Sequence, residues 1–427
     1  AVTTGAGNVV MGSSAANSLT TGGSNVILGK NAGHGSADVD RCVIIGDSAA
    51  EGVLDSGADG TVAIGYSAGA ALTSGNRNVA VGYQALQSMT TGGTNVAIGW
   101  HAMNNANHAD CDDNVVIGGF AGSNFGANGV TATVLIGYAA GDAINSADAT
   151  GTVAVGRNAL SALTDGTGNI CIGDSAGAAL TTADNNTVVG FQALRLATTH
   201  TGNTAIGYHC LEPVTGGSGG DGNNNTAVGS GCLANLTTGI QNTCMGETIG
   251  ATLTTGDNNI IIGGNMNVDA ADAGNRIAIG MGFSTDADNT FQFGKASNIV
   301  QNTFTSNANW AQASDERLKT SINDNDLGLD FINELKTKTY KWKPSNEVPK
   351  ELTRHYNEEN KKDTDVLMYG MMAQEVKELM DKYNHSEFTG WSEHSDGSQD
   401  LSREMFVIPL IKAVQELSAK VEELEAK

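Results

Sequence analysis

The chain has 427 residues, of which 56 are glycine, only 4 are proline and 5% are aromatic, and its formal net charge is −23. This composition is unlike that of a packed α/β enzyme, and the glycines lack the Gly-X-Y period of collagen. An acidic surface without basic clusters disfavours nucleic acid and anionic membranes as partners. No apolar run approaches the ~20 residues that span a bilayer, so we expect no membrane insertion. The chain has no signal peptide and starts at Ala1 rather than Met, so we expect its true N-terminus and attachment region to be missing.

A motif of the form Asn-x-h-h-Gly, where h is apolar, recurs over the first two-thirds of the chain. Of the fifteen intervals between its closing glycines, ten are 17 residues, four are 19 and one is 22. Short β-prone runs such as Val96-Ala97-Ile98 precede these glycines, which supply corners where φ must be positive. One unit cannot bury its apolar side alone, whereas stacked units can, so the pattern predicts a β-solenoid with a 17-residue repeat. The closing glycines are Gly12, Gly29, Gly46, Gly65, Gly82, Gly99, Gly118, Gly137, Gly156, Gly173, Gly190, Gly207, Gly229, Gly246, Gly263 and Gly280.

Other positions that recur from unit to unit hold small residues or asparagine. Asn stands four residues before the glycine in eleven of the sixteen units, so we expect a ladder of stacked side-chain amides. Cys171 and Cys244 share a strand slot, and Cys210 and Cys232 share a slot otherwise held by Ala, which is typical of small buried residues rather than of disulfides or zinc ligands. Because large apolar side chains are few, we expect a lone solenoid to be thinly cored and several chains to share an axis.

These repeats resemble the head repeats of trimeric autotransporter adhesins, and similar repeats occur in phage tail fibres. Thr94-Asn95-Val96-Ala97-Ile98-Gly99 and Asn203-Thr204-Ala205-Ile206-Gly207 carry the likeness. The resemblance implies a left-handed β-roll in a threefold, fibrous assembly, and it implies nothing about a ligand.

The longer units all add residues in the same part of the repeat, as at 51–59, 104–113, 143–149 and 213–224. Insertions at one phase of a solenoid project from one face, and such faces often bind partners. Neutral loop expansion is an equally open interpretation.

A polysaccharide-cleaving activity would need paired carboxylates in a groove lined by aromatic residues. Asp110, Asp112 and Asp113 are available, but aromatic residues are sparse before residue 313, so we interpret these aspartates as solvated loop charges. The same run lacks the spacing of a calcium loop, and the histidines are not paired at metal-ligand spacing. We therefore expect no metal site and no cofactor.

After Gly294 the period fails, and the composition changes abruptly near residue 313. We divide the chain into a repeat shaft (1–297), a polar linker (298–313) and an α+β domain (314–427). Within the last part, apolar periodicity predicts helices over 326–336 and 371–383, a strand over 339–342, and polar connections over 344–365 and 384–400.

The end of the chain predicts a coiled-coil helix, because apolar residues alternate three and four apart. Val at the a positions and Leu at the d positions favours two strands when taken alone. The residues of this seam, which we expect to mediate trimerisation, are Val407, Leu410, Val414, Leu417, Val421 and Leu424.

Four motifs occur in order in the last part: Ser314-Asp315-Glu316-Arg317-Leu318-Lys319, Tyr340-Lys341-Trp342, 370–376 (GMMAQEV) and 409–417 (PLIKAVQEL). With them, residues 313–427 resemble the intramolecular chaperone domain of endosialidases and other phage tailspikes, the peptidase S74 group. The resemblance implies a domain that trimerises a fibre and then cuts itself off with a Ser-Lys dyad. It implies that Ser314 is the nucleophile, that Lys319 is the base, and that the cut falls between Ala313 and Ser314.

Spacing alone is a weak basis for a dyad, since Ser314 could cap the following helix and Lys319 could be a solvated surface residue. A lysine acts as a base only after losing its proton, which burial favours. We therefore expect cleavage only in the assembled trimer.

The sequence as a whole predicts a homotrimeric tail fibre of a phage-like virus, assembled in the host cytoplasm and active outside it on the virion. We expect it to bind other tail proteins and a receptor on the host surface, either a glycan or a protein. A clamp at one end is needed because a repeat can pair one unit out of step at little cost. The alternatives are a bacterial trimeric adhesin, a polysaccharide-depolymerising tailspike and a purely structural spacer.

Overall fold

The computed structural model describes residues 4–126, 128–215, 221–296, 298–304 and 314–427. The chain splits into two compact units, residues 1–313 and 314–427. Each unit has its own hydrophobic core.

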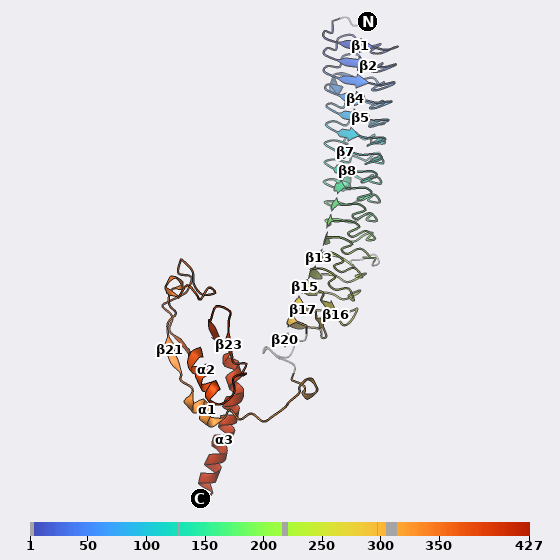
Figure 1. Ribbon diagram of the computed structural model, residues 1–427. Helices are drawn as coiled ribbons and strands as arrows, with labels where there is room; N and C mark the ends of the chain where they lie inside the picture. Colours follow the sequence, from blue (N-terminus) through green and yellow to red (C-terminus); the bar gives the residue numbers. More distant parts are fainter. Residues whose placement is uncertain (1–3, 127, 216–220, 297, 305–313) are drawn as a thin grey trace. The chain divides into compact units, whose positions relative to one another are not determined.

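The first unit is a β-solenoid, as the 17-residue period predicts, and Figure 1 shows its stacked turns. Each strand pairs with the strand of the next turn in parallel and in register, so that Val96 lies opposite Val115. Among the described residues the main sheet has 18 strands, of which only β20 runs antiparallel. The strands of this sheet are β1 (Val9–Met11), β2 (Val26–Leu28), β3 (Val43–Ile45), β4 (Val62–Ile64), β5 (Val79–Val81), β6 (Val96–Ile98), β7 (Val115–Ile117), β8 (Val134–Ile136), β9 (Val153–Val155), β10 (Ile170–Ile172), β11 (Thr187–Val189), β12 (Thr204–Ile206), β13 (Thr226–Val228), β14 (Thr243–Met245), β15 (Ile260–Gly264), β17 (Arg276–Met281), β19 (Thr290–Lys295) and β20 (Asn298–Thr303).

Smaller elements complete the first unit. Two short 3-10 turns, η1 (Ser56–Ala58) and η2 (Ala147–Ala149), lie in the longer units of the repeat. Strands β16 (Asn267–Val268) and β18 (Ser284–Thr285) form a separate parallel pair near its C-terminal end.

The closing glycines make the corner that the sequence predicts. Gly137 has φ +139°, and a Cβ on it would lie 2.3 Å from the carbonyl oxygen of Gly156 in the next turn. A side chain at this corner is therefore excluded twice, by the backbone conformation and by the approach of the next turn.

The asparagine ladder is present and buried. The side-chain oxygen of Asn78 accepts hydrogen bonds from the backbone N–H and the amide of Asn95, at 3.0 and 3.1 Å. The Asn95 amide also donates to the carbonyl of Cys111 at 2.7 Å. In the last of these slots stands Arg276, whose side chain is 5% exposed and pairs with Asp269 and Asp288. The ladder thus satisfies polar groups that stacking removes from water.

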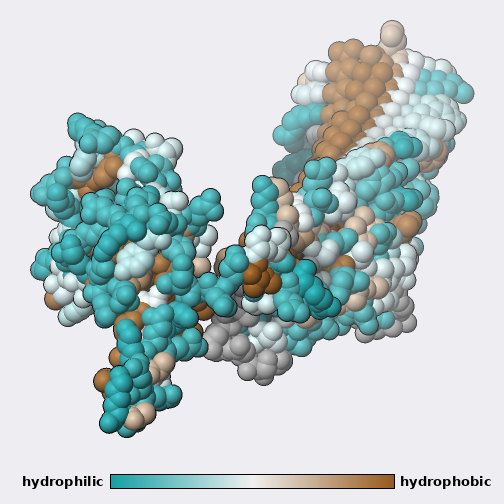
Figure 2. All heavy atoms as spheres, turned by 60° about the horizontal axis from the view of Figure 1, so that its bottom comes forward, coloured by the Kyte–Doolittle hydropathy of each residue, from teal (hydrophilic) through white to brown (hydrophobic). Residues whose placement is uncertain are grey.

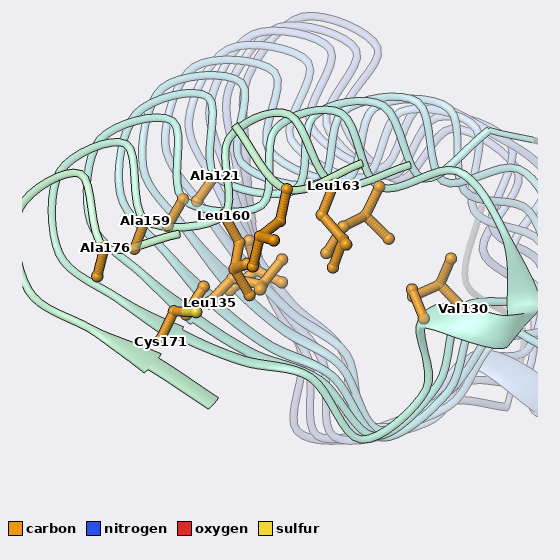
Figure 3. Close-up of a cluster of buried hydrophobic side chains, with 14 of the residues drawn as sticks. Ala121, Val130, Leu135, Ala159, Leu160, Leu163, Cys171 and Ala176 are labelled. Atoms are coloured by element: carbon orange, nitrogen blue, oxygen red, sulfur yellow. The ribbon is translucent and has the colours of Figure 1, made fainter. Parts of the chain in front are cut away.

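The interior of the solenoid is closed by one chain, which corrects the expectation of a thin core needing several chains. The middle residue of nearly every strand is fully buried, as are the small residues that follow the corners. Figure 3 shows Leu135, Leu160 and Leu163 filling the space between the layers of alanines and Cys171. Alanine-sized residues at the walls and Leu or Ile side chains between them together fill each turn to a close-packed density. All six cysteines are buried and free, as the slot pattern predicts.

The outer face of the same sheet is apolar and only partly covered. The strand residue directly before every closing glycine is apolar, and Ile98, Ile172 and Met245 are 37%, 39% and 43% exposed. A hydrophobic band runs along the solenoid in Figure 2. This outer strand face has no partner among the described residues of the chain.

The predicted linker 298–313 differs from the structure over its first half, because residues 298–303 form β20. This strand folds back on β19 and pairs Val300 with Phe293. The hairpin occupies the open edge of the last parallel strand, which would otherwise present unpaired backbone groups. The remaining linker residues from 305 to 313 lie outside the described ranges.

The second unit is α+β. Its elements are η3 (Glu316–Leu318), α1 (Leu329–Glu334), β21 (Lys338–Tyr340), η4 (Ser345–Glu347), β22 (Met368–Gly370), α2 (Ala373–Lys382), β23 (Trp391–Glu393), β24 (Gln399–Leu401), η5 (Arg403–Phe406) and α3 (Val407–Glu425). Leu327, Phe331, Val376, Met380 and Phe406 form the centre of its core. Within the described ranges, every helix is too short or too polar to cross a membrane.

Two predicted elements of this unit need correction. Helix α1 is shorter than the predicted 326–336, because the Asn325 side chain bonds both backbone groups of Leu327 and holds them in a turn. The predicted connection 384–400 contains the hairpin of β23 and β24, in which the Trp391 indole donates to Gln399 at 3.2 Å. Most cross-strand pairs of this hairpin are polar, so the sequence shows no hydrophobic alternation that would predict strands.

Candidate functional site

The two residues of the predicted dyad are in direct contact. The Nζ of Lys319 donates a hydrogen bond to the Oγ of Ser314 at 2.7 Å. Nucleophile and base within hydrogen-bond reach is the geometry that activates a serine. Ser314 is also the first residue of the second compact unit.

A short turn brings these residues together. Asp315 caps η3 by accepting the backbone N–H of Arg317 at 2.9 Å, and the turn carries Lys319 back to Ser314. The Arg317 guanidinium binds the Asp315 carboxylate and holds the pKa of that carboxyl below its ordinary value. Asp315 therefore has its own cationic partner, and the Lys319 ammonium is left to the serine hydroxyl.

The surroundings of the dyad are open and partly apolar in the single chain. Ser314 and Lys319 are exposed, as are the neighbouring Leu318 and Ile322, at 71% and 67%. Water stabilises the charged form of an exposed lysine, so this setting alone does not favour a general base. Ala313, the other side of the predicted cleavage site, lies outside the described residues.

The predicted trimerisation seam forms one exposed face of α3. All six seam residues are between 44% and 70% exposed. The opposite side of the helix packs on its own unit through Pro409 and Ala413, and Glu416 accepts the backbone N–H of Leu329 at 2.8 Å. Ile408 and Ile411 add to the exposed apolar surface, at 57% and 48%. The apolar face is thus wider than a strict a/d seam, which the heptad pattern did not predict.

The aspartates near residue 110 form hydrogen bonds between successive turns. Asp112 accepts the backbone N–H of Gly93 at 2.6 Å, and Asp113 accepts the hydroxyl of Thr94. Across the part of the chain that the structure describes, no group of three or more His, Cys, Asp or Glu residues could hold a metal ion.

One surface feature escaped the sequence analysis. Aromatic residues directly follow the closing glycines of nearby turns, at Tyr66, Tyr83, Trp100 and Tyr138, and Phe120 lies one residue further on in its turn. We call these five residues, together with His101, the aromatic column. Their low overall number concealed them, whereas aligning the turns on the glycine would have revealed them.

Comparison with known proteins bears on the second unit. Residues 314–385 match the model of the family described as chaperone of endosialidase. No curated protein and no solved structure matches the chain. The match begins at Ser314 and includes both residues of the dyad, while α3 follows it. A domain of this family implies trimer formation and is associated with phage tails. The comparison thus shows that residues 314–385 are similar to the endosialidase chaperone family.

Proposed function

We propose that this chain is the subunit of a homotrimeric, phage-like tail fibre, whose C-terminal unit brings three chains into register and then cuts itself off between Ala313 and Ser314. The observation that carries the proposal is the 2.7 Å contact between Lys319 and Ser314 at the first residue of the matched domain. The solenoid would be the shaft, assembled in the host cytoplasm and functional outside the cell on the virion. It would contact other tail proteins and a host receptor.

Two apolar surfaces support assembly, and neither has a partner among the residues that the structure describes. The α3 seam is half-exposed over five turns of helix, and the outer strand face runs along the solenoid. Exposed apolar area of this extent is typical of an interface. Three copies around one axis would cover both surfaces, and the non-repeating α3 seam would prevent the repeats from pairing out of step.

The chemistry of the cut follows from the dyad. Neutral Lys319 takes the proton of the Ser314 hydroxyl as Oγ attacks the carbonyl carbon of Ala313. The peptide C–N bond breaks, the proton passes to the leaving amine of Ser314, and an ester joins Ala313 to Oγ. Water then hydrolyses the ester to a carboxylate on Ala313 and a free serine hydroxyl.

Assembly would switch this reaction on. Covering Leu318 and Ile322 with neighbouring subunits would remove water from the dyad, and desolvation favours the neutral form of a lysine. An unassembled chain would keep a charged lysine and stay intact. Cleavage would therefore follow trimerisation.

The test is to express wild type, Ser314→Ala, Lys319→Ala and Lys319→Arg, and to follow chain length on a denaturing gel. We expect wild type to give fragments ending at residue 313 and beginning at residue 314, and all three variants to stay intact. Lys319→Arg keeps the charge but cannot act as a base near neutral pH, so it separates the two roles. Ser386→Ala and Lys343→Ala, at exposed positions outside the dyad, should cleave normally. Intact wild-type chains within a trimer would refute the protease part alone.

A further inference from the structure

The aromatic column is a continuous run of ring contacts along the solenoid. Tyr66 and Tyr83 stack with their centroids 5.2 Å apart, and Tyr83 contacts His101 at 5.5 Å. His101 stacks on Phe120 at 5.4 Å, and Phe120 meets Tyr138 at 6.0 Å. In-register stacking places equivalent residues of successive turns ~4.8 Å apart, so rings at this position must touch.

The fold does not need rings at this position. Several other turns carry a polar or charged residue directly after the glycine, and one pair of these residues, Arg157 and Asp174, forms an ion pair at 2.8 Å. The outer strand face, by contrast, carries an apolar residue directly before the closing glycine in every turn. An assembly seam would be expected to continue along the whole shaft, so ring clusters limited to residues 66–138 and 191–209 indicate a local function.

The rings of the column are not all parallel to one another. Tyr66 and Tyr83 are nearly parallel, so each covers a face of the other. Trp100 is turned by 60° and Tyr138 by 84° relative to Phe120, and these two rings are 52% and 54% exposed. Between them stands Gly119, at the position where neighbouring turns carry a ring, and Tyr138 lies over it. The segment from Trp100 to Tyr138 is therefore the part of the column in which the rings are not stacked face to face throughout.

Hydrogen-bonding groups lie beside these rings. The Asn104 amide is 2.8 Å from Nδ1 of His101, and Ser123 donates to Asp142 at 2.5 Å in the following turns. All three of these polar residues stand five positions after their closing glycines. Amide, hydroxyl and carboxylate side chains thus occupy one position of the repeat in the same three turns that carry Trp100, Phe120 and Tyr138.

The same arrangement recurs further along the shaft. Phe191 stacks on Tyr208 at 5.5 Å, and Tyr208 meets His209 at 4.1 Å. His209 bonds Glu212, which also accepts from Arg195 at 2.6 Å. Both ring clusters have polar residues five positions after the closing glycine. This repetition argues against a chance arrangement of surface residues.

From this placement we propose that the column from Trp100 to Tyr138 binds an extended, neutral carbohydrate chain on the host surface. Sugars present apolar C–H faces to aromatic rings and hydroxyls to amide, hydroxyl and carboxylate groups, which is the combination found here. Residues 1–313 carry 7 Lys+Arg and 22 Asp+Glu, and this negative field disfavours anionic glycans. The segment from Trp100 to Tyr138 extends over two turn spacings, roughly 10 Å, so it fits a short oligosaccharide rather than a single sugar unit.

This assignment rests on the proposed function, because it names the receptor of the same fibre. The test uses the assembled wild-type protein on an array of neutral oligosaccharides, with polysialic acid as the anionic comparison. We expect at least one neutral glycan of several units to bind, and polysialic acid not to bind. Trp100→Ser should weaken that binding about tenfold or more. Two other turns already have serine directly after the closing glycine, at Ser13 and Ser230, so the fold should accept serine at residue 100.

Arg157→Ser is the matched control, with the same position in the repeat and the same replacement outside the column. It should bind like wild type. Silence of all neutral glycans, equal binding by Trp100→Ser, or binding of polysialic acid alone would overturn the assignment. So would a Trp100 shielded from acrylamide quenching in the assembled fibre. Light scattering and gel analysis of the same samples report trimerisation and cleavage, so failure of the glycan site is distinguished from failure of the proposed function.

Discussion

At the scale of single residues, the shaft depends on positions where only one side chain fits. The closing glycines combine a positive φ with backbone contact to the next turn, and a buried asparagine such as Asn95 bonds both neighbouring turns. These requirements repeat because every turn lies on an equivalent turn. A defect in one turn therefore disturbs two interfaces.

The first prediction concerns Gly137→Ala. The new Cβ would lie 2.3 Å from the Gly156 oxygen at φ +139°, so we expect a loss of more than about 3 kcal/mol of stability. Chemical unfolding followed by circular dichroism measures it. Gly264→Ala is the control, because nothing lies within 4 Å of its Cβ position and its φ is not positive. Equal stability of the two variants would contradict the corner argument.

At the scale of elements, α3 has two faces with different tasks. Pro409, Ala413 and Glu416 attach it to its own unit, while the seam residues are left exposed. Heptad chemistry alone pointed to two strands. The additional exposed Ile408 and Ile411 widen the apolar face, which is compatible with more than one neighbouring helix.

A second prediction belongs to this helix. Leu417→Asp places a charge in the seam, and a buried unpaired carboxylate is costly, so we expect single chains that do not cleave. Because Leu417 is 50% exposed in the single chain, the helix content should not change. Ala419→Asp, the same replacement away from the seam, should assemble and cleave. Light scattering gives the mass of each, and a trimeric Leu417→Asp would show that the chains meet elsewhere.

At the scale of the whole molecule, the core and the assembly are separate matters. One chain closes the interior of its own solenoid, so trimerisation is not required to bury the core. What remains uncovered is the outer strand face, which is nearly alike in every turn and so contains little information about register. Correct alignment must then come from a non-repeating part of the chain.

The last prediction compares two routes to the same shaft. Wild-type chains that assemble first and cleave afterwards should leave a stable trimer of residues 1–313. Chains expressed without residues 314–427 should instead give mixed masses, because their repeats can pair out of step. Ser314→Ala, which keeps the C-terminal unit attached, is the control and should form trimers. A uniform trimer from the truncated chain would remove the need for a chaperone.

The sequence by itself determined the period, the glycine corners, the asparagine ladder, the buried cysteine slots and the match to the chaperone domain. The features of the repeat can be predicted from residue spacing, because parallel stacking in register places residues at the same position of successive units next to one another. Tertiary structure alone decided that one chain closes the core, that residues 298–303 return as β20, and that Lys319 reaches Ser314. It also decided how the aromatic rings at one position of the repeat are turned relative to one another. Such contacts depend on how the longer turns absorb their extra residues and on which way each side chain faces, and a repeat pattern does not specify either.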